Sequence, residues 1–252
     1  MIAVISPAKT LDYNRELPPL PVTRPAWEAE ASALAAAAAK MSPKKLSALM
    51  DISDKLAELN VARFRGFEEL PERPAIYAFA GDVYAGFEVH SLDEEAVLYA
   101  QDHVRILSGL YGLLRPLDAI RPYRLEMGTR WAPGRKGDLY AFWGERIASG
   151  LENDLREAGA PVIVNLASKE YWTAAARHLP TGTRVIEIDF REEGPSGLRF
   201  NTFAAKRARG MMARWICEHR IDEPEPLKAF DSDGYAYDPD NSDGARWRFS
   251  RS

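Results

Sequence analysis

Four side chains in this sequence have the chemistry of acid–base or nucleophilic catalysts: Lys9, Asp12, Asp82 and Glu126. A lysine can act as a nucleophile, and a carboxylate can act as a general base when its surroundings adjust its pKa. The structural alternatives are a surface lysine, turn-capping aspartates and an ion pair between Glu126 and Arg124. The residue types leave both interpretations open, so the elements that position these side chains must be considered next.

Three of these residues follow short apolar segments. Lys9 and Asp12 lie in a loop after residues 1–5, which are predicted to form a buried strand. Asp82 follows residues 75–79, a second predicted strand, in a turn bracketed by glycines. In α/β proteins, loops that leave buried strands commonly carry functional side chains. This position makes the three residues candidates for a functional site.

The segment from Arg105 to Gly128 is dense in arginine, glycine and proline. Residues 108–112 are expected to form a tight connection after a helix that ends near Leu107, and their exposed amides could face an anion. Pro116 cannot lie deep in a helix, so the next helix could begin only at about Arg115. We interpret the segment as a rigid, cationic binding wall.

Charge is distributed unevenly along the chain, although the formal net charge is −4. Residues 105–130 carry a local charge of +3 and residues 199–220 a local charge of +5, which leaves −12 on the remainder. Residues 204–216 are expected to form a helix, and Gly210 within it indicates that another helix or a ligand comes close to the backbone. If the two basic segments meet in the fold, they form a positive cleft.

The composition argues against several classes of function. The single cysteine, Cys217, excludes an internal disulfide, and the four histidines are not spaced as metal ligands, so neither a metal nor a cofactor is expected. The sequence has no Walker loop, Rossmann glycine fingerprint or Ser-His-Asp set. It has no apolar run long enough to span a bilayer and no basic leader, so we expect a cytoplasmic protein without membrane contacts.

The apolar pattern predicts a single α/β domain over residues 1–252. Further strands are expected at residues 123–127, 162–166 and 183–190, with residues 199–203 as a hairpin partner of the last and with a terminal hairpin of residues 235–237 and 247–249. Helices are expected at residues 27–41, from residue 42, and at residues 53–64, 91–107, 139–158, 170–179 and 204–216.

Six blocks of the sequence carry a family resemblance: residues 5–12, 81–84, 107–118, 122–128, 165–168 and 205–211. In this order they resemble the signature blocks of the YaaA family, bacterial proteins of the peroxide stress response. The similarity extends from near Met1 to the region of Gly234 and Tyr235. Several independent blocks in one order make the resemblance specific.

The resemblance implies a mixed central sheet flanked by helices in an unusual topology, a positively charged cleft and a helix-hairpin-helix element, which would fall at residues 108–112. It also implies non-specific binding of double-stranded or junction DNA, and a role in limiting damage from free iron and hydroxyl radicals. The residues that would contact phosphate are Ser108, Gly109, Tyr111, Gly112, Arg115, Arg121, Arg124, Lys206, Arg207 and Arg209.

The sequence therefore leaves two functions open. The first is a DNA-binding stress protein without catalysis. The second is an enzyme that acts on a nucleotide, a nucleobase or another phosphorylated small molecule, with arginines on the phosphate and Lys9, Asp12, Asp82 or Glu126 in the chemistry. A DNA surface has little use for Asp12 or Asp82, which fits the enzyme better, but the family resemblance makes DNA binding the interpretation that we prefer. A structural network of ion pairs is the third interpretation.

Overall fold

The central sheet is built around strand β1 (Ile2–Ile5). This strand lies between β5 (Val104–Ser108) and β8 (Val162–Asn165) and pairs with both in parallel. Every residue of the three strands is buried, as expected where helices and loops cover both faces of a parallel sheet. The computed structural model describes residues 1–159, 161–195 and 197–252.

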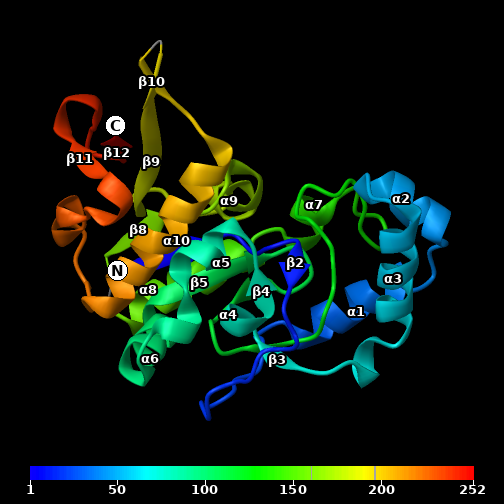
Figure 1. Ribbon diagram of the computed structural model, residues 1–252. Coiled ribbons are helices and arrows are strands. Elements are labelled where there is room, and N and C mark those ends of the chain that lie inside the picture. Colours follow the sequence, from blue (N-terminus) through cyan, green and yellow to red (C-terminus); the bar gives the residue numbers. More distant parts are fainter. Residues whose placement is uncertain (160, 196) are drawn as a thin grey trace.

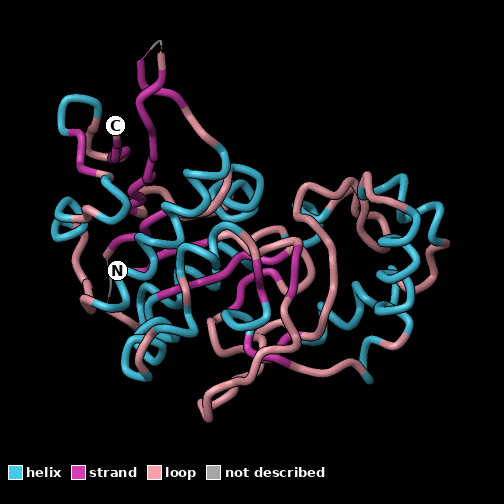
Figure 2. The backbone as a smooth tube through the Cα atoms, viewed as in Figure 1, coloured by secondary structure: helices cyan, strands magenta, loops and turns pink. Residues whose placement is uncertain are grey.

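Parallel strands form the middle of the sheet, and antiparallel strands complete its edges. The strand order is β11-β12-β9-β8-β1-β5-β6, and β10 pairs with β9. The bounds of the other strands are β6 (Gly112–Leu114), β9 (Arg184–Gly194), β10 (Gly197–Arg199), β11 (Ala236–Asp238) and β12 (Arg246–Arg251). The strands β6, β10 and β11 run antiparallel to their neighbours. The expected mixed sheet flanked by helices is confirmed (Figure 2).

Helices surround the sheet, and α1 to α3 gather to one side of it (Figure 1). The helices are α1 (Glu28–Ala38), α2 (Pro43–Met50), α3 (Asp54–Arg65), α4 (Ala75–Ala78), α5 (Asp82–Phe87), α6 (Glu94–His103), α7 (Leu139–Trp143), α8 (Arg146–Glu157), α9 (Lys169–Ala176) and α10 (Thr202–Glu218). Two-residue strands form two small ladders: β2 (Thr10–Leu11) with β4 (Phe79–Ala80), and β3 (Arg73–Pro74) with β7 (Ala119–Ile120). Within the described residues, no helix is both long enough and apolar enough to cross a membrane.

Several predicted elements differ from the structure. Residues 75–79 were expected to form one strand but form the short helix α4 followed by β4. The predicted helix 91–107 is too long, because its last part is the buried strand β5. Residues 123–127 alternate in sequence but form no strand, and the predicted helix 139–158 is divided near Gly144, where φ is +51°.

Other predicted elements are confirmed. The strands at residues 162–166 and 183–190 are β8 and β9, and the terminal hairpin is the antiparallel pair of β11 and β12. The predicted helix 204–216 is α10, which extends one or two residues further at each end. Strong apolar or helical patterns thus identified these elements correctly.

Helices α5 and α10 approach each other backbone to backbone. A Cβ atom added at Gly210 would lie 1.8 Å from the carbonyl oxygen of Val83, and one added at Gly86 would lie 2.1 Å from that of Arg207. Figure 1 shows the two helices side by side. Of the two explanations that the sequence offered for Gly210, a nearby helix is the one that the structure contains.

The first prediction concerns this crossing. Gly210→Ala should lower the free energy of unfolding by about 2 kcal/mol or more, because the clash with Val83 outweighs the roughly 1 kcal/mol that alanine gains in a helix. Urea denaturation measures the change. Gly137→Ala is the control, because an added Cβ there meets no atom within 4 Å. Equal stability of Gly210→Ala and the wild type would contradict the close packing.

Candidate functional site

The carboxyl ends of β1 and β8 open onto a cavity of about 410 Å³, which we term the strand-end pocket. Its charged lining residues are Lys9, Asp82, Glu170, Lys206 and Arg209. Ser6 and Ser168 also line it, and the Ser168 amide donates to Oγ of Ser6 over 2.8 Å. Because β1 and β8 are parallel neighbours, the residues that follow them meet at one edge of the sheet.

The small ladder of β2 and β4 brings Lys9 and Asp82 to the same pocket. Thr10 lies opposite Ala80 in this antiparallel ladder, so Lys9, just before Thr10, lies close to Gly81 and Asp82, just after Ala80. Nζ of Lys9 lies 3.5 Å from Oε1 of Glu126. Three of the four candidate catalytic residues, Lys9, Asp82 and Glu126, are therefore at or beside this pocket.

Helix α10 supplies the cations of the opposite wall. Lys206 and Arg209 are three residues apart and project from one side of the helix. Nζ of Lys206 lies 3.9 Å from Oδ2 of Asp82, and both side chains are more than 40% exposed, so this pair is weak. Burial lowers the pKa of the Arg209 guanidinium.

A third group of residues extends the site towards the first basic segment. Nε of Arg124 donates to Glu126 over 3.0 Å, and the Gly128 amide donates to the Glu170 carboxylate over 2.9 Å. Glu126 is only 14% exposed and also faces Lys9. Through these contacts, the two basic segments approach each other beside the strand-end pocket.

Asp12 lies elsewhere. Its carboxylate accepts hydrogen bonds from the amides of Asn14 and Arg15, at 2.8 and 3.3 Å, and so caps a turn. The Asn14 amide is the main reason that the pKa of Asp12 is lowered. Asp12 lines a second cavity of about 700 Å³ together with Arg15 and His90. The structure does not bring Asp12 together with Lys9 at the strand-end pocket.

Residues 108–112 do not form the helix-hairpin-helix element that was expected there. They join β5 to β6 as a β-hairpin, so no helical hairpin is present here. Their polar groups face inward: Oγ of Ser108 lies 2.6 Å from the Tyr123 hydroxyl, and the Tyr111 hydroxyl accepts from the Arg121 amide over 3.0 Å. Gly109 packs against the backbone of Leu125, and Gly112 packs against Trp143. The turn has a packing role.

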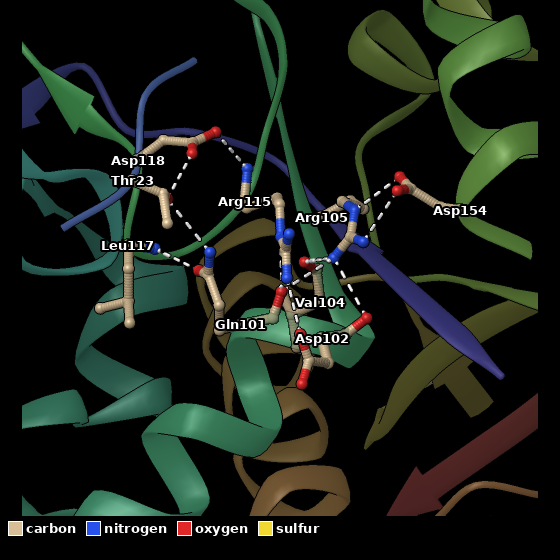
Figure 3. A network of polar contacts seen from close by, with 9 residues as sticks. All are labelled: Thr23, Gln101, Asp102, Val104, Arg105, Arg115, Leu117, Asp118 and Asp154. Carbon is tan, nitrogen blue, oxygen red and sulfur yellow. Dashed lines mark hydrogen bonds and ion pairs between the residues drawn. The ribbon is translucent and has the colours of Figure 1, made fainter. Parts of the chain in front are cut away.

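The arginines of the first basic segment are paired with carboxylates. The pairs join Arg105 to Asp154, Arg115 to Asp102, Arg121 to Glu72 and Arg124 to Glu126. In the network around Gln101, Arg105 contacts Asp154 through two nitrogen atoms at 2.6 and 2.9 Å, while Asp118 accepts from Thr23 and from the Arg115 amide (Figure 3). Asp154, Asp102 and Glu72, which lie outside this segment in the sequence, thus offset most of its positive charge.

Helices α2 and α3 form a hairpin that the sequence interpretation treated as scaffold. Only residues 51–53 connect them, and Asp51 adopts a left-handed conformation with φ of +50°. Lys44, Lys45 and Lys55 are exposed on this pair. In the parts of the chain that the structure describes, no carboxylate oxygen lies within 4 Å of their ammonium groups. The helical hairpin therefore presents lysines without ion pairs, although the carboxylates of Asp51, Asp54 and Glu58 are exposed on the same pair of helices.

Two pocket residues were not identified as candidates from the sequence. Ser6 directly follows β1, and Glu170 lies at the start of α9, shortly after β8. The polar character of both strand ends was the available signal. Across the described ranges, no three His, Cys, Asp or Glu side chains gather into a group that could hold a metal ion.

The fold and the pocket define a mixed α/β protein with cations gathered at the carboxyl ends of its central strands. The profile of a family described as "peroxide stress protein YaaA" matches residues 1–241. A UPF0246 protein of Rhizorhabdus wittichii is 64% identical over 249 residues, which cover 99% of this chain and 98% of that protein. UPF0246 proteins of Caulobacter vibrioides and Hahella chejuensis are 47% and 44% identical over 100% of this chain and 99% of each relative. The chain belongs to the YaaA family of peroxide stress proteins.

A second prediction follows from the ion pairs. Asp154→Ala should lower the free energy of unfolding by about 3 kcal/mol, because it leaves the buried guanidinium of Arg105 without its carboxylate. Asp102→Ala removes the partner of Arg115, which is 43% exposed, and should cost less than about 1 kcal/mol. Urea denaturation compares the two variants. Similar costs for both would show that burial does not set the strength of these pairs.

Proposed function

We propose that this protein acts in the peroxide stress response by binding the phosphate backbone of double-stranded or junction DNA. Membership of the YaaA family supports the stress role. The observation that carries the DNA proposal is the helical hairpin of α2 and α3, with its exposed lysines. Lysines at the surface release counterions from DNA without reading its sequence.

The start of each helix in this hairpin adds hydrogen-bond donors. Ser42 and Ser53 cap α2 and α3 through their side chains, each accepting from the amide of the third residue of its helix; the first residue of α2, Pro43, has no N–H group. The earlier amides have no partner within a helix and can donate to phosphate oxygens. Lys44 and Lys45 lie in the first turn of α2, and Lys55 lies in the first turn of α3. Ammonium groups and free amides are thus adjacent at both helix starts.

Two cations of α10 are further candidates for DNA contact. Arg207 is exposed and has no carboxylate within 4 Å in the described residues, and Lys206 has only the weak pair with Asp82. The buried turn at residues 108–112 takes no part in this proposal. The role in limiting damage from free iron stays a prediction, as does the position of the protein in the cytoplasm.

The third prediction tests the DNA surface by fluorescence anisotropy of labelled duplex and four-way junction across a salt series. The wild type should bind both, with an affinity that falls steeply as salt rises. The double variant Lys44→Glu/Lys45→Glu should bind at least tenfold more weakly, and its salt slope should decrease by about two. Arg207→Glu should have a smaller effect of the same kind.

Arg156→Glu is the control, because Arg156 is an exposed arginine on α8 whose side chain, among the described residues, donates a hydrogen bond to Asn153 alone. It should bind DNA as the wild type does. Asp82→Asn should also keep DNA binding, because it removes no cation. Wild-type affinity in the double variant would contradict the role of the helical hairpin, and absence of duplex binding by the wild type at moderate salt would contradict the DNA proposal.

A further inference from the structure

The guanidinium of Arg209 has no counter-ion. Its Nε atom is fully buried and has no hydrogen-bond partner in the described residues, and no carboxylate oxygen of those residues lies within 4 Å of the group. The side chain as a whole is only partly buried, but a buried N–H group without a partner costs free energy, so such groups are normally hydrogen-bonded. This arginine therefore needs an explanation.

The nearest acidic residues already have partners. Glu187 and Asp189 act on Arg209 only at a distance. Glu187 accepts from Nδ2 of Asn165 over 2.7 Å, and Asp189 accepts from Arg191 and Arg248 over 2.9 and 3.1 Å. Both carboxylates are thus engaged by other side chains. The positive charge thus faces the strand-end pocket, which Arg209 lines.

Other donors surround the same cavity. Lys206 is one helical turn from Arg209, and its weak pair with Asp82 leaves the ammonium free to turn inward. Oγ of Ser6 accepts from the Ser168 amide, so its own proton is available to a ligand. The side chain of Ser168 makes no capping bond to α9, which leaves the first amides of that helix without a partner from the cap. These donors suit the several oxygen atoms of a phosphate group.

The pocket also carries carboxylates. Asp82 and Glu170 line it and can accept hydrogen bonds from hydroxyl or amino groups. A volume of about 410 Å³ lies within the range of small-molecule sites. The pocket therefore combines cations, which suit a phosphate group, with carboxylates, which can accept hydrogen bonds from the rest of the same molecule.

We propose that the strand-end pocket binds a phosphate monoester that also carries hydroxyl groups, with Arg209 and Lys206 on the phosphate and Asp82 and Glu170 on the hydroxyls. The proposal is independent of DNA binding by the helical hairpin. Such a phosphate can belong to a small metabolite or to the 5′ end of a nucleic acid strand. Both sources present the same dianionic group.

The fourth prediction is tested by isothermal titration calorimetry of the full chain with ribose 5-phosphate, with ribose, and with a short oligonucleotide that has either a 5′-phosphate or a 5′-hydroxyl. Ribose 5-phosphate should bind the wild type, and ribose should not. A 5′-phosphorylated oligonucleotide that binds more tightly than both ribose 5-phosphate and the 5′-hydroxyl oligonucleotide would identify a strand end as the source. Equal binding of the two oligonucleotides, with binding of ribose 5-phosphate, would identify a metabolite. Failure of both phosphorylated probes to bind at millimolar concentration would overturn the proposal.

Variants of two residues locate the binding. Lys206→Gln, at a half-exposed position, and Arg209→Met should each weaken ribose 5-phosphate at least tenfold. Arg156→Gln, on α8, should leave the affinity unchanged. Wild-type affinity in Arg209→Met would overturn the proposal.

A thermal readout separates binding from folding. Without phosphate, Arg209→Met should melt at or close to the wild-type temperature, because it removes a partly buried charge whose Nε has no partner in the described residues. Addition of ribose 5-phosphate should raise the melting temperature of the wild type but not of Arg209→Met. A large fall in melting temperature for Arg209→Met without ligand would show that the fold itself needs this charge, which would overturn the argument from an unpaired guanidinium.

Discussion

The contact between α5 and α10 fixes the position of the charged groups in the strand-end pocket. The two helices can approach this closely only because Gly86 and Gly210 have no side chains. Asp82 stands at the start of α5, while Lys206 and Arg209 stand on the adjoining part of α10. A larger distance between the helices would separate the carboxylate from the cations. The position of the pocket therefore depends on backbone packing more than on attraction between the charges themselves.

The sequence predicted the elements whose pattern is local and strong. The alanine-rich and capped helices, the buried strand β8 and the terminal hairpin all have clear signals in a few consecutive residues. The strand β5 was missed because Val104 to Ser108 continue the apolar pattern of the helix before them. Arg105 also made β5 look exposed in the sequence, because an arginine is rarely buried without a partner. Its partner, Asp154, is distant in the chain. Such long-range compensation leaves no trace in a local pattern.

The candidate site likewise has features that a local pattern predicted and features that depend on long-range contacts. Lys9, Asp82, Lys206 and Arg209 were identified by residue type and by their position after strands or on a helix, and the structure brings them to one pocket. The summed charge of a segment was a poor guide, because it does not count ion pairs with the rest of the chain. The first basic segment is largely neutralised by such pairs. Lys44, Lys45 and Lys55, in contrast, belong to helices that the sequence interpretation treated as scaffold. The helical hairpin was assigned to residues 108–112, where glycine and proline are dense, although these residues form a β-hairpin.

The central place of β1 has a consequence for how the chain folds during synthesis. Its partners β5 and β8 lie about 100 and 160 residues later in the sequence. At the usual rate of translation, about 5 to 20 residues per second, β1 waits roughly 8 to 30 seconds before β8 leaves the ribosome. Contacts over such separations form slowly, because a long loop must close first. During this interval an apolar strand with two unpaired edges is exposed, which makes the nascent chain a natural client for ribosome-associated chaperones.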